Sequence, residues 1–445
     1  MRIMHPLLFL PFVVFTSLNG QDFYLGADLS YVNEMEDCGV VYQEEENAKD
    51  PYAIFADQGA NLIRLRLWHT PAWYDELNDG RRYSDLADVK RSIQRAKAAN
   101  MQVLLDFHFS DFWADPSRQI VPKAWAAVVD DLPALQDSLH QYVRATLLDL
   151  SAEGLLPDMI QVGNETNKGI MQSEEADAAG WALDWPRNAA LFNTAIDAIR
   201  EIEEEANKEL KIALHIAGPE NAAWLLAGFW DNGVRDFDLV GLSYYWAWHQ
   251  PTTIERTGEI IAEIKQDFPG KQVMIFETGY IWTTEANDEA NNIISSVQEG
   301  YAPASPEHQR RWLIDLSQEV YNQGGLGVLY WEPAWVSSSC FTPWGRGSHQ
   351  EHAAFFDFTN NLLGEGGIGF LNHDYTGSVA TRPELAAASF RVYVRPDGRS
   401  MVLEREEATL GQKGDNLRLS DMSGRELLRR KLMGGTSRDT IPLPA

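Results

Sequence analysis

The stretch Met159-Ile-Gln-Val-Gly-Asn-Glu165 decides the fold class, and Gln272-Val-Met-Ile-Phe-Glu277 repeats its design. Short runs rich in Val, Ile, Met and Phe that stop at a polar residue are typical of buried β-strands. In a barrel of parallel strands, a carboxylate at the carboxyl end of a strand points into the mouth, where active sites lie. The two stretches therefore predict strands that bring Glu165 and Glu277 to one cleft.

Apolar runs of this kind recur between residues 22 and 370, and amphipathic stretches separate them. One such stretch runs from Leu86 to Ala96 behind a possible Ser84 cap, and another runs from Leu191 to Ile202. Strands that alternate with helices predict an α/β fold, a (β/α)8 TIM barrel with long loops. An open doubly wound sheet is the alternative, but no G-x-G-x-x-G motif follows any run. The eight predicted strands are Tyr24–Asp28, Asn61–Trp68, Val103–Phe107, Met159–Gly163, Ile212–His215, Leu239–Tyr244, Val273–Phe276 and Gly327–Trp331.

A second, smaller region begins near residue 381, where the composition changes. All fifteen tryptophans lie at or before Trp344, and short alternating runs such as Phe390–Val394 and Leu417–Ser420 follow. These runs predict a small C-terminal β-sandwich joined by a linker near Thr376–Pro383. The predicted domains are a signal peptide at 1–20, a catalytic barrel at 21–375 and a β-rich domain at 381–445.

Composition and charge exclude several classes of partner. The chain has 445 residues, 44% of them hydrophobic, which suits a large barrel plus a smaller module better than one compact domain. Lys and Arg number 37 against 65 Asp and Glu, a net charge of −28. So acidic a surface repels nucleic acid and anionic membranes, and it suits a soluble protein that handles a neutral substrate.

The first twenty residues resemble a secretory signal. Arg2 precedes an apolar run from Pro6 to Phe15 that is too short to span a bilayer, and Gly20 offers a cut site before Gln21. No other stretch is apolar enough to form a transmembrane segment. The sequence therefore predicts an exported protein that is secreted or attached to the cell surface.

The two cysteines, Cys38 and Cys340, are either a disulfide or two buried free thiols. Export to an oxidising compartment would let them pair. They lie in the loops after the first and last predicted strands, which are neighbours in a closed barrel. A disulfide is therefore the prediction, with the requirement that the two Cα atoms come within about 7 Å.

Two carboxylates that face one cleft are the catalytic groups that hydrolysis of a glycosidic bond requires. In a retaining mechanism, Glu165 would be the protonated acid/base, and Asn164 would hydrogen-bond the sugar 2-hydroxyl. Glu277 would stay ionised as the nucleophile, with Arg64 and either Tyr244 or Tyr245 as donors. Arg64 and Arg66 share one face of their strand, and a structural Arg–carboxylate pair in the barrel interior is the alternative for each.

Aromatic residues crowd the same strand ends, more than packing alone requires, and sugar rings stack on flat aromatic faces. His108 closes the third strand and is either structural or part of the sugar pocket. The aromatic and imidazole side chains at the predicted mouth are Trp68, His69, Trp113, Trp125, Tyr244, Tyr245, Trp246, Trp248, Trp282, Trp331, Trp335 and Trp344.

Six motifs lie at the predicted strand ends: Asn61–Trp68, Asp106–Pro116, Gly163–Glu165, Gly241–Tyr245, Glu277-Thr278 and Tyr330–Trp335. Together they resemble those of the endo-β-1,4-galactanases, family 53 of the glycoside hydrolases. The resemblance covers residues 22–370 and implies Glu165 as acid/base, Glu277 as nucleophile, and double-displacement cleavage of the β-1,4-galactan of pectic arabinogalactan without a cofactor. One departure is Trp246, where family members usually carry Pro, which affects the shape of a subsite. The substrate-binding residues that follow are Arg64, His108, Trp113, Asn164, Tyr244, Tyr245, Trp331 and Trp335.

The resemblance also implies a structural calcium ion and a sorting domain. Similar bacterial enzymes bind calcium in the loop after the seventh strand, and hard oxygen ligands alternate here at Glu285, Asn287, Glu289 and Asn291. A solvated acidic loop is the alternative. The segment Asp421–Leu428 resembles a turn in the sorting domain of the type IX secretion machinery, with an accessory β-sandwich as the alternative.

Two other functions remain open at this point. A mannanase or xylanase of the same barrel clan would share both glutamates, and an inactive barrel could bind surface glycan without cleaving it. The presence of both glutamates argues against the inactive barrel. A comparison of reducing-sugar release from galactan and from mannan would distinguish the enzymes.

Overall fold

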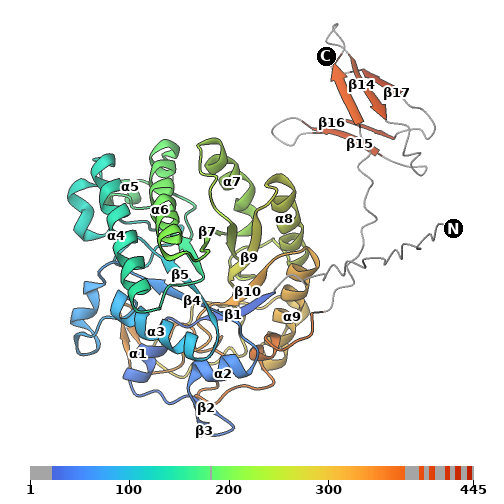
Figure 1. The fold of residues 1–445 in the computed structure, drawn as a ribbon. Helices are drawn as coiled ribbons and strands as arrows, with labels where there is room; N and C mark the ends of the chain where they lie inside the picture. The colour runs from blue at the N-terminus through green and yellow to red at the C-terminus, as the bar shows by residue number, and fades with distance from the viewer. Residues whose placement is uncertain are drawn as a thin grey trace, which may run out of the picture. The chain divides into compact units, whose positions relative to one another are not determined.

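The structure is a computed structural model that describes residues 23–180 and 183–375, together with the backbone of five strands between 390 and 442. Eight parallel strands form a closed barrel with helices around it, as Figure 1 shows, and the pairing of β1 with both β4 and β10 closes it. The predicted (β/α)8 barrel is therefore confirmed. In chain order the barrel strands are β1 (Tyr24–Asp28), β4 (Leu62–Leu67), β5 (Gln102–Phe107), β6 (Met159–Val162), β7 (Lys211–Ala217), β8 (Leu239–Ser243), β9 (Gln272–Glu277) and β10 (Gly327–Tyr330).

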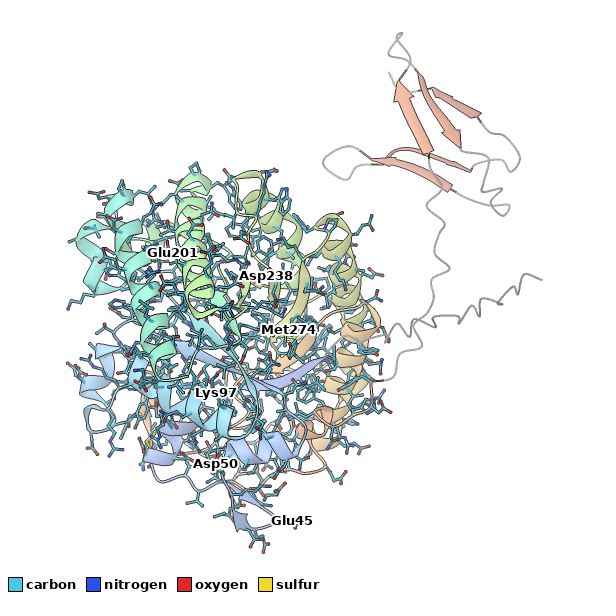
Figure 2. The ribbon with its side chains drawn as sticks, viewed as in Figure 1. Glu45, Asp50, Lys97, Glu201, Asp238 and Met274 are labelled. Carbon is cyan, nitrogen blue, oxygen red and sulfur yellow. A yellow bond between two sulfur atoms is a disulfide. The ribbon has the colours of Figure 1, made fainter. Side chains whose placement is uncertain are left out.

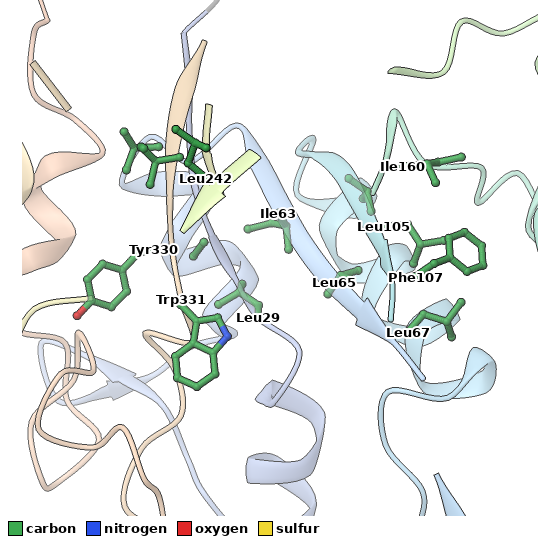
Figure 3. Packing of buried hydrophobic residues seen from close by; sticks show 14 of the residues in the cluster. Leu29, Ile63, Leu65, Leu67, Leu105, Phe107, Ile160, Leu242, Tyr330 and Trp331 are labelled. Carbon is green, nitrogen blue, oxygen red and sulfur yellow. The ribbon is translucent and has the colours of Figure 1, made fainter. Parts of the chain in front are cut away.

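Alternation along the strands divides the buried residues into two layers. On β4, Ile63, Leu65 and Leu67 pack outward against the surrounding helices, in the cluster drawn in Figure 3. Leu62 faces the barrel interior, where each strand contributes at least one apolar side chain to a second buried cluster. This interior cluster consists of Tyr24, Leu62, Leu104, Met159, Ala213, Leu239, Met274, Phe276, Leu326 and Leu329, and Figure 2 labels Met274 within it.

Above this apolar floor, the interior positions become polar. Two residues beyond Leu62 and Leu104 come Arg64 and Asp106, and both are buried. Because successive side chains on a strand point to opposite faces, residues two positions apart share a face. The interior side chains nearer the carboxyl ends of these strands are therefore the polar ones. The sequence thus places its charged interior residues at the barrel mouth.

Amphipathic helices cover the barrel, and both predicted helices form. The first, α3, begins one residue after Asp85, whose side chain accepts the Asp88 N–H at 2.9 Å. The predicted Ser84 cap is therefore wrong, because a residue nearer the first turn caps the helix. The helices are α1 (Val32–Asp37), α2 (Pro51–Asp57), α3 (Leu86–Ala98), α4 (Leu132–Ala152), α5 (Glu174–Ala178), α6 (Trp185–Ala206), α7 (Ala222–Asp231), α8 (Ile254–Asp267) and α9 (Pro306–Asn322).

Long loops rise from the barrel, and two of them are joined covalently. Short hairpins lie in the loops after β1 and β10, namely β2–β3 (Gln43–Glu44 with Asn47–Ala48) and β11–β12 (Phe341–Thr342 with Gly345–Arg346). Cys38 and Cys340 form a disulfide between these two loops, with their Cα atoms 5.6 Å apart. The neighbouring positions of β1 and β10 make this bond possible.

The chain divides into two compact units, 1–376 and 377–445. In the second unit, β13 (Phe390–Val394), β14 (Ser400–Arg405) and β17 (Arg438–Pro442) form one antiparallel sheet, and β15 (Asn416–Ser420) pairs with β16 (Glu426–Lys431). The predicted strands are present there. The predicted signal peptide, the linker and the first half of the Asp421–Leu428 turn lie outside the described residues. Within the described part of the chain, no helix is both long and apolar enough to cross a membrane.

Candidate active site

Glu165 reaches the mouth through a sharp turn at the end of β6. Gly163 and Glu165 both have positive φ angles, 77° and 45°. A side chain at Gly163 would meet the methyl groups of Thr166 and Ile170 at 2.6 and 3.0 Å, so this turn requires glycine. The buried Gln119 amide holds the turn by donating to the carbonyls of Asn164 at 2.8 Å and Glu165 at 3.2 Å. These contacts hold Glu165 in its strained left-handed backbone conformation.

Glu277 reaches the mouth through a different device, an irregularity in the β8–β9 ladder. Leu242 pairs with Ile275 and Ser243 pairs with Glu277, which leaves Phe276 unpaired. Such a bulge allows consecutive side chains to face the same way. Phe276 fills the interior because Gly241 opposite leaves space, where an added Cβ would lie 2.1 Å from its ring.

Arg64 links the two strand ends. Its side chain is 1% exposed and its guanidinium group donates five hydrogen bonds, so each of its N–H groups has a partner. Three of the acceptors are carboxylates, which compensate for burial of the cation. Nη1 donates to Glu277 at 2.7 Å and Asp28 at 2.9 Å, Nη2 to Asp106 and Asn164 at 2.7 Å each, and Nε to Gln161 at 3.0 Å.

Arg66 instead supports the wall of the cleft. It pairs with the buried Glu332 at 3.1 Å. Its guanidinium carbon lies 4.1 to 4.9 Å from the ring centres of Trp113, Trp68 and Tyr31. The alternative of a structural Arg–carboxylate pair therefore holds for Arg66, whereas Arg64 contacts the carboxylates at the barrel mouth.

The two glutamates differ in electrostatic surroundings. Burial and the charge of Glu277 raise the pKa of Glu165 well above its usual value, and a hydrogen bond from Ser243 opposes that rise. Burial also raises the pKa of Glu277, but Arg64 opposes it, and the Tyr245 hydroxyl donates to this carboxylate at 3.1 Å. One proton shared by the pair therefore belongs on Glu165, which leaves Glu277 ionised.

The structure brings Tyr245, not Tyr244, to the carboxylate. The Tyr244 hydroxyl donates to the Thr252 carbonyl at 2.9 Å, and its ring lies nearly parallel to those of His249 and Trp312. Adjacent residues at a strand end point to opposite faces, so only one of the two tyrosines can face the mouth. The prediction of Tyr244 as a substrate-binding residue is corrected to a packing role.

His108 is buried just beyond the end of β5. Its Nδ1 is 3.0 Å from the Asp106 carboxylate, and its ring meets Trp68 and Trp113 edge-on. Burial lowers the pKa of His108, so the ring is neutral near neutral pH. His108 therefore contacts the cavity only through Trp113, which lines it.

A cavity of about 550 Å³ is lined largely by aromatic side chains, and its lining includes Asp115, whose charge acts on Glu165. Trp335 stacks on Tyr31 with ring centres 3.9 Å apart, which fixes one wall, whereas Trp344 is 55% exposed. Such flat faces suit the apolar side of sugar rings. The lining includes Trp113, Trp331, Trp335 and Trp344 of the predicted aromatic residues and Asn291 of the predicted calcium ligands, and it adds Phe112, Asp115, Ser117, Arg118, Asn292, Ile293 and His349. Trp246, which stands where family members usually carry Pro, is half-buried and packs against the core.

Sequence reasoning missed several polar residues in contact with the two glutamates or with Arg64. Asp28 ends β1 and Ser243 ends β8 just as Glu277 ends β9, so the same signal could have identified both. The other three interrupt apolar strands as single polar residues, a weaker signal. The missed residues are Asp28, Asp106, Gln161, His215 and Ser243.

The four residues predicted to bind calcium lie in the loop after β9, and all four are exposed. None of the four side chains makes a hydrogen bond within the described part of the chain, so their oxygen atoms are free to bind a cation. Two other carboxylates organise the loop. Asp288 accepts the Ser348 N–H at 2.6 Å, and the buried Glu351 accepts the Asn287 N–H at 2.8 Å. Among the described residues, no group of three His, Cys, Asp or Glu side chains is arranged to hold a metal.

Several known proteins are similar to this chain in sequence and in fold. The chain is 47% identical over 345 residues to an arabinogalactan endo-β-1,4-galactanase of Cellvibrio japonicus, which covers 77% of this chain and 89% of that protein. It is 36% identical over 325 residues to an endo-β-1,4-galactanase of Bacillus subtilis, which covers 71% of each chain. The solved GH53 catalytic domain of Ignisphaera aggregans superposes with a TM-score of 0.71 at 31% identity and covers 80% of this chain and 97% of that one. The model of glycosyl hydrolase family 53 matches residues 24–365, so the chain belongs to glycosyl hydrolase family 53.

Proposed function

We propose that this glycoside hydrolase is an endo-β-1,4-galactanase in which Glu277 attacks the anomeric carbon of a β-1,4-galactan. Glu165 gives its proton to the glycosidic oxygen as that bond breaks, which leaves a galactosyl ester on Glu277. Glu165, now ionised, takes a proton from water as the water attacks the anomeric carbon, and Glu277 departs. Two inversions leave the configuration retained. One observation carries this proposal: Arg64 and Tyr245 bond Glu277, while burial keeps the proton on Glu165.

Substrate class and mode of cleavage follow from the cleft and the relatives. The Cellvibrio japonicus and Bacillus subtilis proteins carry the name endo-β-1,4-galactanase. The aromatic cavity suits several neutral sugar units in a row, and the acidic surface does not hinder a neutral polymer. Cleavage within the β-1,4-galactan of pectic arabinogalactan is therefore the proposed activity.

Reducing-sugar release from galactan, mannan and xylan tests the substrate class. We expect release from galactan at least a hundredfold faster than from the other two, with oligosaccharides as early products. Preference for mannan or xylan would identify another enzyme of the same clan, and absence of turnover on all three would leave a binding barrel. Proton NMR of the first products must show the β-anomer before mutarotation, because retention requires it.

Export and sorting form a separate proposal, supported by the apolar run Pro6–Phe15 and the second compact unit. We propose that residues 1–20 direct export and that residues 381–445 carry a type IX sorting signal. Removal of 381–445 should leave galactan hydrolysis unchanged and alter only where the enzyme is found after cell fractionation. Loss of activity or of folding in the truncated protein would make that region part of the catalytic unit.

A structural calcium ion is also proposed, with Glu285, Asn287, Glu289 and Asn291 as its side-chain ligands. Their exposure and free oxygen atoms support it. When bound, the ion would brace the loop after β9, and the hydrolytic steps do not pass through it.

A further inference from the structure

A buried serine and histidine connect to the proposed acid/base Glu165. Ser243 ends β8 and His215 lies in the neighbouring β7, and neither side chain is exposed. The Ser243 hydroxyl lies 3.0 Å from His215 Nε2 and hydrogen-bonds the Glu165 carboxyl group. The three side chains therefore form one continuous chain of hydrogen bonds.

The other ring nitrogen of His215 faces both donors and an acceptor. The Glu165 N–H points to Nδ1 at 3.2 Å, and the Gln161 amide nitrogen lies 3.1 Å from it. The Asn164 side-chain oxygen lies 2.9 Å from the same nitrogen. Nδ1 therefore finds a partner whether or not it carries the proton, so the site accommodates both neutral tautomers.

The ring is neutral in either case. Burial lowers the pKa of His215 well below its usual value, and the nearby Arg64 lowers it further, against the opposite effect of Asp106. His215 carries one proton on one nitrogen, and a hydroxyl can donate and accept at once. Ser243 can therefore accept from His215 while it donates to Glu165.

We propose that Ser243 and His215 are positioning residues that hold the Glu165 carboxyl group in both of its protonation states. His215 keeps its single proton on Nε2 in both states, donates that N–H to Ser243 Oγ, and accepts the Glu165 N–H at Nδ1. While Glu165 is protonated, the Ser243 hydroxyl donates to its carbonyl oxygen. Once Glu165 has given its proton to the leaving oxygen, the same hydroxyl donates to the carboxylate, so no proton moves among the three side chains.

This arrangement answers a demand of double displacement, and the inference rests on the proposed function. Glu165 must be an acid in the first step and a base in the second. Burial, Glu277 and Asp115 all favour its protonated form, which suits only the first step. Besides Arg64, the Ser243 hydroxyl is the group that favours the ionised form, which the second step needs.

The test is the pH profile of Ser243→Ala on two substrates. Loss of the hydroxyl donor should raise the pKa of Glu165 and move the basic limb of kcat/KM on galactan upward by about one pH unit. An aryl β-galactobioside with a good leaving group needs no protonation in the first step. Its kcat/KM should stay within about twofold of wild type, while its kcat should fall about tenfold, because the Glu165 carboxylate that activates water has lost the hydroxyl that favours its ionised form and holds it in position.

Two further variants separate positioning from a folding defect. His215→Gln keeps a group that can donate and accept near Nε2, so its basic limb should lie close to that of wild type, whereas His215→Ala should behave like Ser243→Ala. Ser84→Ala is the matched control, because Ser84 is buried and its hydroxyl has no hydrogen-bond partner in the described part of the chain. Its pH profile should equal that of wild type.

Three results would overturn the proposal: an unmoved basic limb in Ser243→Ala, an equal shift in Ser84→Ala, or an equal loss of kcat/KM on both substrates. If Ser243→Ala fails to fold, the two His215 variants decide, and identical limbs for them contradict the proposal. Activity of the wild-type enzyme on galactan is measured first. Its absence would remove the proposed function itself, whereas an active wild type with unmoved limbs removes only this inference.

Discussion

The ends of β6 and β9 deliver the same residue type to one cleft, but they surround it differently. At the end of β9, Glu277 receives hydrogen bonds from Arg64 at 2.7 Å and from Tyr245 at 3.1 Å. At the end of β6, burial dominates the pKa of Glu165, and the Ser243 hydroxyl and the charge of Arg64 oppose its effect. Donors stabilise an ionised carboxylate, and burial stabilises a protonated one. The difference shows how one side chain can serve as nucleophile and as acid in the same site.

The two strand ends also differ in backbone geometry. The β6 end turns through positive φ at Gly163 and Glu165, whereas the β9 end uses a bulge at Phe276. Gln119 fixes the first device, and the space over Gly241 permits the second. The turn after β6 orients only the Glu165 carboxyl group, and the bulge in β9 orients only that of Glu277. The two strand ends can therefore be tested separately.

Removal of the β9 carboxylate should have the largest effect. Glu277→Ala can form no galactosyl ester, so we expect turnover to fall by about 10⁴-fold or more on galactan and on activated aryl substrates alike. Steady-state rates on both substrates check this, with circular dichroism to show that the barrel is intact. A variant that kept activated substrates at near wild-type rates would reverse the roles assigned to the two strand ends.

Removal of the β6 carboxyl group should have a smaller effect that depends on the substrate. Glu165→Ala should lose about 10²- to 10⁴-fold on galactan, whose leaving group needs a proton. On an aryl substrate with a good leaving group, the first step should remain near wild type and ester accumulate as a burst. The basic limb of the wild-type kcat/KM profile should vanish in this variant, because that limb reports ionisation of Glu165, whose pKa is raised. A limb that persists would belong to another group.

Much of this contrast was predictable from the sequence, because each strand end is visible as an apolar run that stops at a polar residue. The predicted runs differ from the observed strands by a few residues at most, and both glutamates lie at strand ends as expected. Arg64 was predictable too, since a charge within an apolar strand requires buried partners.

The missing parts depend on three-dimensional neighbours. The bulge at Phe276 depends on an opposing Gly241 on another strand, and the choice between Tyr244 and Tyr245 depends on which face of β8 is interior. Both tyrosines are aromatic, so alternation of polarity gives no signal there. His215 and Ser243 acquire their meaning only because β6, β7 and β8 lie side by side.

The disulfide should affect the β9 side of the mouth more than the β6 side. It joins the loops after β1 and β10, and β10 is the neighbour of β9. The bond spans a sequence separation of 302 residues, for which chain-entropy arguments give about 4–5 kcal/mol of stability. Cys38→Ala with Cys340→Ala should therefore lower the melting temperature by several degrees and raise KM on galactan, because Trp344 lies on the loosened loop. Free thiols titrating in the native wild-type protein would contradict the bond.

The smallest expected effect concerns calcium and again separates the two strand ends. The proposed ligands Glu285 and Glu289 follow β9, so an ion there would brace the loop after Glu277 and leave the β6 turn untouched. Because a ligand that binds only the folded state stabilises it by mass action, a chelator should lower the melting temperature by a few degrees and calcium should restore it. Glu285→Ala with Glu289→Ala should melt at the chelated temperature and ignore both additions. Glu299→Ala, an exposed carboxylate in the same connection between β9 and α9, should respond as wild type does. A melting curve of the wild-type enzyme that is indifferent to the chelator would show that this loop holds its shape through Asp288 and Glu351 alone.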